Sequence, residues 1–197
     1  IDLSNIIENY GLIDPNVLLS KLSDIFKRHN LYNPTFMELY KKTGKNVIVT
    51  GTNVSKIRCE CFSHNHTPHM HILKALEISI SIPFVFNMVK YNGDIYADGG
   101  VMCMTPDFVF SDVDKEHKLC ISIQKKSCCG SNPSIVDYTY SVIQCAIAAQ
   151  HMVTSASSLV IIPDDDIDLI QHYTEADIVR LYDEGVQKAI EFFKKRR

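Results

Sequence analysis

Apolar spacing and helix-ending residues together predict five helices along the chain. The first begins at Pro15, the next two cover residues 35–43 and 70–81, the fourth covers 134–153, and the last follows Thr174. Apolar residues in three of these segments recur every three or four positions, as they do on the buried face of a helix. The segment 134–153 is apolar on nearly every side, which predicts a buried helix.

Local chemistry fixes several of these helix ends. Thr35 is followed three residues later by Glu38, and Thr174 is followed three residues later by Asp177. This spacing lets each side chain bond the other residue's backbone N–H, which starts a helix. Gly44 is a typical residue just past a helix end, because it accepts the left-handed backbone.

Short β-branched runs between the helices predict strands. They cover residues 47–50, 119–123 and 159–162, and residues 58–63 are a further candidate strand beside the first. A hairpin is predicted where Asn92-Gly93 separates 89–91 from 95–97, because both turn residues accept positive φ. Gly51-Thr52-Asn53 is interpreted as a turn. Strands that alternate with helices predict an α/β layered fold with a mostly parallel central sheet.

Composition restricts the function classes. The chain has 197 residues, with 20 Lys and Arg against 23 Asp and Glu. This near-neutral charge argues against nucleic-acid binding, which favours a basic face. The length predicts a single domain over residues 1–197. Seven irregularly spaced Cys predict free thiols in an intracellular, cytoplasmic setting, with membrane association left open.

An ordered series of motifs lies between Thr43 and Pro106. It begins with Thr43-Gly44-Lys45 ahead of a buried strand, continues through Phe62-Ser63, and includes the stretch Ile78-Ser79-Ile80-Ser81-Ile82-Pro83-Phe84. It ends with Tyr96-Ala97-Asp98-Gly99-Gly100 and Pro106. In this order and spacing the series resembles the C-terminal portion of the patatin-like phospholipase domain.

The resemblance implies a three-layer α/β/α domain and a lipid acyl hydrolase with a Ser–Asp dyad. Asp98 matches the base that takes the proton of the nucleophilic Ser, and Gly99 and Gly100 match its supporting loop. Two glycines there permit a sharp turn and a close approach of a neighbouring chain. The substrate would be a phospholipid or another lipid ester, with peripheral contact to a membrane surface and with no metal or organic cofactor.

Two departures from the family pattern matter. No Ser lies in a Gly-x-Ser-x-Gly elbow, and no Gly-rich oxyanion loop is present. The family order places both before Ile1, so we expect the N-terminal part of the domain to precede this chain. Met104 stands where the family usually has Asn. Without that N-terminal part the sheet would have an unpaired edge, and unpaired edges associate with other chains. We therefore expect this chain to require the missing segment or an oligomeric partner.

Other residues admit two interpretations each. Asp98 alone could begin a turn, and Ser79 or Ser81 could be a substitute nucleophile or a packing residue. His64, His66, His69 and His71 could hold a metal, although Asn65, Thr67 and Pro68 favour a polar loop. The last group to weigh comprises Cys128-Cys129, the run Asp164-Asp165-Asp166, and the basic end Lys194-Lys195-Arg196-Arg197. They could be a redox pair, a calcium site and a contact to anionic lipid. We favour loop cysteines, a solvated turn, and charges that complement a helix C-terminus.

The sequence is compatible with two hypotheses of function. One is the lipid acyl hydrolase, with Asp98 as base. The other is a non-catalytic relative that acts as a binding or structural partner, which Met104 favours. Hydrolysis by the full-length protein separates the two.

Overall fold

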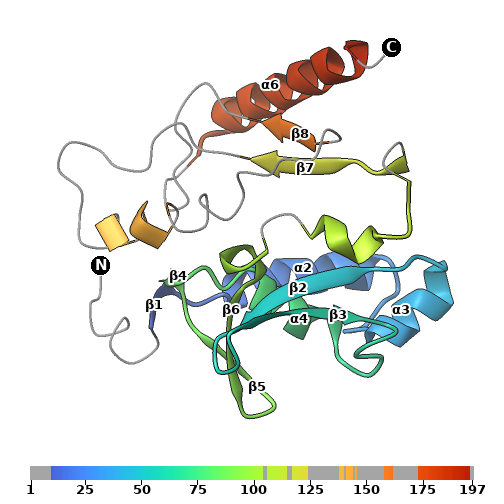
Figure 1. Ribbon diagram of the computed structural model, residues 1–197, viewed down its shortest axis with the longest axis vertical. Helices are drawn as coiled ribbons and strands as arrows, with labels where there is room; N and C mark the ends of the chain where they lie inside the picture. The colour runs from blue at the N-terminus through green and yellow to red at the C-terminus, as the bar shows by residue number, and fades with distance from the viewer. Residues whose placement is uncertain are drawn as a thin grey trace. The chain divides into compact units, whose positions relative to one another are not determined.

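A computed structural model describes most of the chain in two compact units (Figure 1). The described residues are 10–103, 106–114, 117–123, 138–139, 141–143, 145, 158–161 and 173–195. The first unit is Ile1–Met104 and the second is Thr105–Arg197. The interpretation of 1–197 as one domain stays a prediction.

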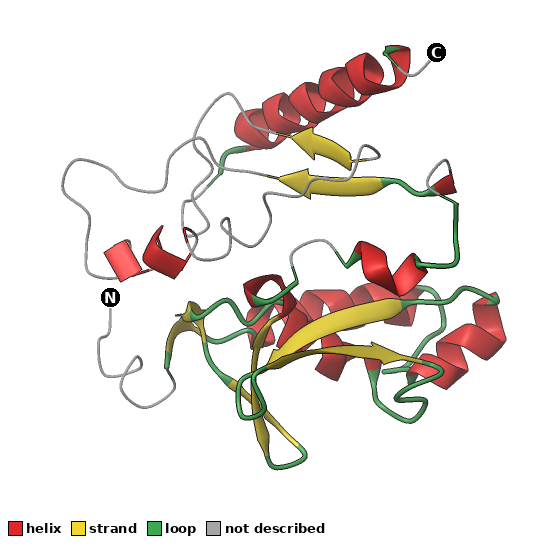
Figure 2. Ribbon diagram, viewed as in Figure 1, coloured by secondary structure: helices red, strands yellow, loops and turns green. Residues whose placement is uncertain are grey.

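The first unit contains all of the motif series up to Asp98-Gly99-Gly100. Its helices are α2 (Asn16–Arg28), α3 (Phe36–Thr43), α4 (Ile72–Ser79) and the 3-10 turn η1 (Gly99–Val101). Its strands are β1 (Gly11–Ile13), β2 (Ile48–Asn53), β3 (Arg58–Ser63), β4 (Phe84–Phe86), β5 (Val89–Tyr91) and β6 (Asp94–Asp98). The α/β class is therefore confirmed, and helices and strands intermix in Figure 2.

The four-stranded sheet has the order β3-β2-β6-β5 and is antiparallel throughout. The expected parallel pairing occurs instead in two smaller sheets, β1 with β4 and β7 with β8. For two of the three pairs, β2–β3 and β5–β6, the reason lies in the connections. A short turn joins β2 to β3, and Asn92-Gly93 joins β5 to β6, and such short links permit only antiparallel neighbours.

Strand β2 is longer than its β-branched residues indicated. Gly51, Thr52 and Asn53 belong to the strand and are buried, so the interpretation of these residues as a turn was wrong. Each of them pairs with β3 on one side and β6 on the other. Pairing on both sides outweighs the weak strand propensity of Gly and Asn.

Helix α4 covers one face of this sheet. It packs against β2 and β6, and α2 packs against α4 (Figure 1). Ala75 and Ile78 of α4 are fully buried beside Phe62 of β3 and Tyr96 of β6. The helix is shorter than the predicted 70–81, and it ends before Pro83, which cannot continue a helix.

The predicted ends of the helix over 35–43 and the predicted hairpin are confirmed in the first unit. Thr35 and Glu38 form a capping box at the start of α3, and Gly44 ends that helix with φ of 65°. Asn92 and Gly93 adopt φ of 49° and 84° between β5 and β6. Helix α2 follows Pro15, as its apolar face predicted.

The second unit contains the 3-10 helix η2 (Asp107–Phe110), β7 (Cys120–Ile123), β8 (Ser158–Ile161) and α6 (Glu175–Lys194). Strands β7 and β8 pair in parallel, and Thr174 and Asp177 form the predicted capping box of α6. The predicted helix over 134–153 falls mostly outside the described residues. Within the described part of the chain, no helix combines the length and apolar character needed to cross a membrane.

Candidate catalytic site

Asp98 is the last residue of β6 and lies directly before η1. Its backbone N–H donates to the carbonyl oxygen of Ser81 at 2.9 Å. Its carbonyl oxygen accepts a hydrogen bond from the Thr52 hydroxyl at 2.8 Å. Backbone contacts on both sides of its Cα therefore hold the residue in place.

The Asp98 carboxylate turns back onto the chain that follows it. Oδ1 accepts a hydrogen bond from the Gly100 backbone N–H at 2.6 Å. Burial raises the pKa of this carboxyl to about 6, although the Gly100 hydrogen bond acts in the opposite direction. A partly buried carboxylate with a pKa near 6 is ionised at neutral pH and is a stronger base than an exposed Asp.

The close approach expected at Gly99 is confirmed. A Cβ added to Gly99 would lie 2.4 Å from Thr50 Oγ1 and 2.6 Å from the Thr50 carbonyl oxygen. A Cβ added to Gly100 would lie 2.9 Å from Asp98 Oδ1. The two glycines thus let η1 pack directly on β2 beside the carboxylate.

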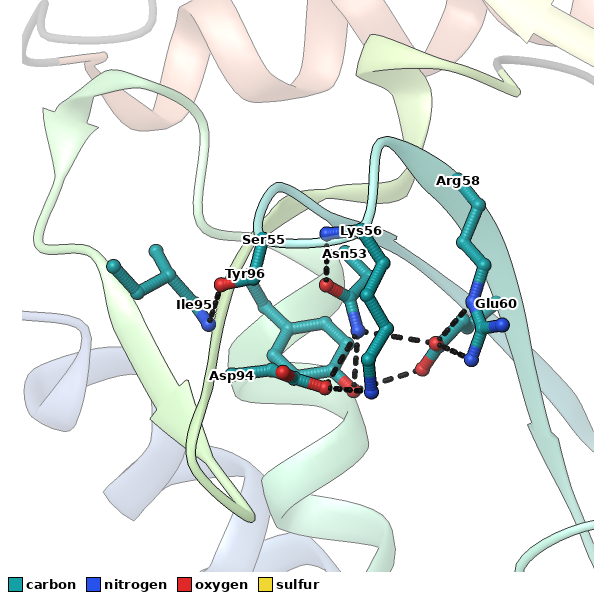
Figure 3. A network of polar contacts seen from close by, with 8 residues as sticks. All are labelled: Asn53, Ser55, Lys56, Arg58, Glu60, Asp94, Ile95 and Tyr96. Atoms are coloured by element: carbon teal, nitrogen blue, oxygen red, sulfur yellow. Dashed lines mark hydrogen bonds and ion pairs between the residues drawn. The ribbon is translucent and has the colours of Figure 1, made fainter.

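A network of polar side chains joins β2, β3 and β6 at the end of the sheet away from Asp98 (Figure 3). Asn53 is fully buried, and its amide nitrogen lies 3.0 Å from Glu60 Oε1, 3.0 Å from Asp94 Oδ2 and 3.2 Å from Tyr96 Oη. The Tyr96 hydroxyl donates to Glu60 Oε2 at 2.8 Å, and Lys56 pairs with Asp94. Burial and the Glu60 carboxylate raise the pKa of Tyr96 to about 12. The network joins β2, β3 and β6, so it fixes the register of the strand that carries Asp98.

Removal of the Asn53 side chain is expected to lower the free energy of unfolding by about 2–3 kcal/mol. Asn53→Ala leaves Glu60 and Asp94 facing each other without the amide donor, and buried polar groups that lose their partners are costly. Chemical denaturation of Asn53→Ala beside Asn16→Ala, at the exposed first residue of α2, measures the difference. Equal stability of the two variants would contradict this role.

Ser81, the alternative nucleophile, and His64 and His66, two of the metal candidates, make structural contacts. Ser81 is buried, and its hydroxyl donates to the Ile78 carbonyl oxygen at 2.6 Å. His64 stacks on Tyr40 with ring centroids 3.8 Å apart. His66 Nδ1 lies 3.0 Å from the Ser63 hydroxyl. Among the described residues, no three His, Cys, Asp or Glu side chains are grouped as a metal would require.

Several candidates lie outside the described residues. These are Met104, Cys128, Cys129 and the run 164–166, together with the last two residues of the basic end. Lys194 is the last residue of α6 and Lys195 is its C-cap, the position where positive charge complements the helix dipole.

Sequence reasoning missed Thr52, which bonds the Asp98 backbone, and Asn53, which is the centre of the polar network. Both follow a β-branched run and are only 4% and 0% exposed. The available signal was a polar triplet directly after a buried strand, with two hydrogen-bonding side chains in it. It was interpreted as a turn, because Gly and Asn favour turns when no tertiary pairing intervenes.

Comparison with known proteins agrees with this fold and motif order. The sequence profile of the patatin-like phospholipase family matches residues 3–107, more than half of the chain. The chain therefore belongs to the patatin-like phospholipase family. The matched stretch nearly coincides with the first compact unit and includes Asp98-Gly99-Gly100.

Two viral proteins are similar to parts of the chain. A probable lipid hydrolase of Invertebrate iridescent virus 6 is 45% identical over 67 residues, which are 34% of this chain and 23% of that protein. An uncharacterized protein of Acanthamoeba polyphaga mimivirus is 34% identical over 106 residues, which are 53% of this chain and 34% of that protein. The chain thus matches about a third or less of each relative's length.

Proposed function

We propose that the polypeptide to which this chain belongs is a serine lipid acyl hydrolase with Asp98 as its general base. The observation that carries the proposal is the Asp98 carboxylate itself, held at the end of β6 with its pKa raised to about 6. Family membership and the name of the iridescent-virus relative support the same reaction class. The nucleophilic Ser and the oxyanion loop are supplied from outside residues 1–197.

The proposed reaction proceeds through an acyl-enzyme. The Ser oxygen attacks the acyl carbonyl carbon of a lipid ester while its proton passes to the Asp98 carboxylate. Backbone N–H groups of the oxyanion loop stabilise the negative charge that develops on the carbonyl oxygen. Asp98 then returns the proton to the leaving alcohol oxygen. Water then attacks the acyl carbon while Asp98 removes its proton. The bond between the acyl carbon and the Ser oxygen breaks, Asp98 returns the proton to that oxygen, and the fatty acid leaves.

The position of Asp98 suits a base that works without a histidine. The carboxylate accepts one backbone hydrogen bond from Gly100, which leaves further lone pairs for a Ser hydroxyl. Its backbone is fixed at both peptide groups, so little motion is needed to keep base and nucleophile within hydrogen-bonding distance. We propose a phospholipid or other lipid ester as substrate, with peripheral contact at a lipid surface.

The pH dependence of hydrolysis follows from the Asp98 pKa. Only the ionised carboxylate accepts the Ser proton, so kcat/KM is expected to fall tenfold per pH unit below about 6 and to level off above it. This decrease, the acidic limb of the profile, is measured by recording kcat/KM of the complete polypeptide on a soluble fatty acyl ester as a function of pH. A limb near pH 4, the range of an unperturbed carboxyl, would contradict the environment described for Asp98.

Covalent labelling tests the proposed function directly. A fluorophosphonate reacts with an activated Ser, so the complete polypeptide is expected to acquire one label, on a Ser outside residues 1–197. Asp98→Asn is expected to slow labelling, whereas Asp114→Asn, at an exposed position after η2, leaves it unchanged. Absence of labelling and of ester hydrolysis in the complete polypeptide would refute the hydrolase and favour a non-catalytic binding role.

A further inference from the structure

The Thr52 side chain makes an unusual contact across the sheet. Thr52 lies opposite Ala97 in the β2–β6 register, yet its hydroxyl reaches the next residue along β6 and donates to the Asp98 carbonyl oxygen at 2.8 Å. Thr52 is only 4% exposed. A buried hydroxyl that is satisfied by one particular carbonyl restricts the orientation of that peptide group.

The peptide group between Asp98 and Gly99 controls the carboxylate. Asp98 has φ of −47° and ψ of 138°, and this ψ sets where the following chain goes. That chain brings the Gly100 N–H to 2.6 Å from Asp98 Oδ1. Rotation of the peptide would therefore move the only backbone donor that the structure gives to this carboxylate within the described residues.

The other side of Asp98 is fixed separately. Its N–H is bound to the Ser81 carbonyl oxygen at 2.9 Å, and Gly99 packs directly on the backbone of Thr50. The first contact holds the peptide before Asp98, and the second limits translation of η1. Neither fixes the rotation of the Asp98–Gly99 peptide, which is the degree of freedom that the Thr52 hydroxyl restricts.

We propose that Thr52 is a positioning residue for the catalytic base: its buried hydroxyl holds the Asp98–Gly99 peptide so that the Asp98 carboxylate and the Gly100 N–H stay aligned. The inference rests on the proposed function, because it gives Thr52 a role in that same reaction. In this role Thr52 acts through Asp98 and exchanges no proton with the substrate.

The test compares three variants of the complete polypeptide on a soluble fatty acyl ester. Thr52→Val keeps the side-chain volume and removes the donor, Thr52→Ser keeps the donor, and Ser63→Ala removes a different buried hydroxyl that is bonded to His66. Thr52→Val is expected to lower kcat about 10- to 100-fold with little change in KM, because a small misplacement of a catalytic group has that effect. Thr52→Ser keeps the donor, so its kcat is expected to stay close to that of the parent protein and above the range expected for Thr52→Val.

The pH profile separates positioning from simple loss of stability. The Gly100 hydrogen bond lowers the pKa of Asp98, so a misaligned Gly100 N–H should move the acidic limb of kcat/KM to higher pH in Thr52→Val. Ser63→Ala should leave the limb in place even where its thermal stability falls equally. A 13C NMR titration of the Asp98 carboxyl gives the same pKa without depending on turnover.

The outcomes distinguish the two proposals. If Thr52→Val behaves as Ser63→Ala does, in kcat and in the Asp98 pKa, the positioning role is refuted while an inactive Asp98→Asn still supports the proposed function. If Asp98→Asn remains active, the proposed base is refuted. An upward shift of the NMR pKa in Thr52→Val would then still establish that Thr52 orients the carboxylate.

Discussion

Replacement of Asp98 by Asn is expected to reduce kcat of the complete polypeptide about 1000-fold, the size of a lost general base. The same change is expected to increase the free energy of unfolding at neutral pH. Asn retains an oxygen that can accept the Gly100 hydrogen bond at the position of Asp98 Oδ1. It carries no charge, so the desolvation that opposes the buried carboxylate disappears.

The pH range of this stability gain follows from the raised pKa. Asp98 has a pKa of about 6 in the folded protein against a model value of 3.8, so the folded state holds the carboxyl proton more tightly than the unfolded state does. That contribution is complete below pH 3.8 and is lost as pH rises through about 6. The stability difference between Asp98→Asn and the parent protein should therefore grow from near zero at low pH to about 3 kcal/mol above pH 6.

Urea denaturation at a series of pH values measures this difference. Asp94→Asn is a matched control, because Asp94 lies on the same strand and Lys56 and Asn53 hold the pKa of its carboxyl below the usual range. This control should lose stability at neutral pH, which is the opposite sign. A loss of stability in Asp98→Asn at neutral pH would show that the carboxylate is not destabilised by burial.

Gly99→Ala is expected to lower the free energy of unfolding by about 3 kcal/mol or more, the upper range for overpacking. The added Cβ would meet Thr50 Oγ1 at 2.4 Å and the Thr50 carbonyl carbon at 2.8 Å. Thr50 cannot retreat easily, because β2 is hydrogen-bonded to β3 on its other side. A thermal melt of the variant should show a clear decrease in Tm.

Gly185→Ala is the control for the cost of adding a methyl group at a glycine. Gly185 lies within α6, and a Cβ there would meet nothing within 4 Å. Because Ala favours a helix over Gly, this variant is expected to gain about 1 kcal/mol. Equal melting temperatures for Gly99→Ala and Gly185→Ala would mean that η1 can move away from β2 without loss of stability.

Much of the fold could be predicted because its boundaries are set locally. The capping boxes at Thr35 and Thr174 and the Asn92-Gly93 turn depend on residues within a few positions of one another, and all three are confirmed. The direction of strand pairing was harder to predict. It depends on which strands meet, and the antiparallel β2–β6 pair joins segments with α4 and three strands between them.

The site could be predicted only in part, because some of its contacts are local and others join distant segments. Asp98, Gly99 and Gly100 are adjacent in sequence, so one motif identifies them. Thr52 and Ser81 lie on other segments, and only the folded chain brings their hydroxyl and carbonyl groups to Asp98. No local pattern distinguishes the Thr52 hydroxyl from that of any other strand threonine.

The pairing of β1 with β4 has a consequence for synthesis on the ribosome. Gly11 pairs with Phe84, so the first described strand cannot find its partner until the chain beyond Phe86 has emerged. The hairpins β2–β3 and β5–β6 close over short loops and can form within microseconds. The Thr52–Asp98 contact forms only when these hairpins dock, since Thr52 belongs to one and Asp98 to the other. The carboxylate thus reaches its buried, basic state late in folding, after most of the first unit has left the exit tunnel.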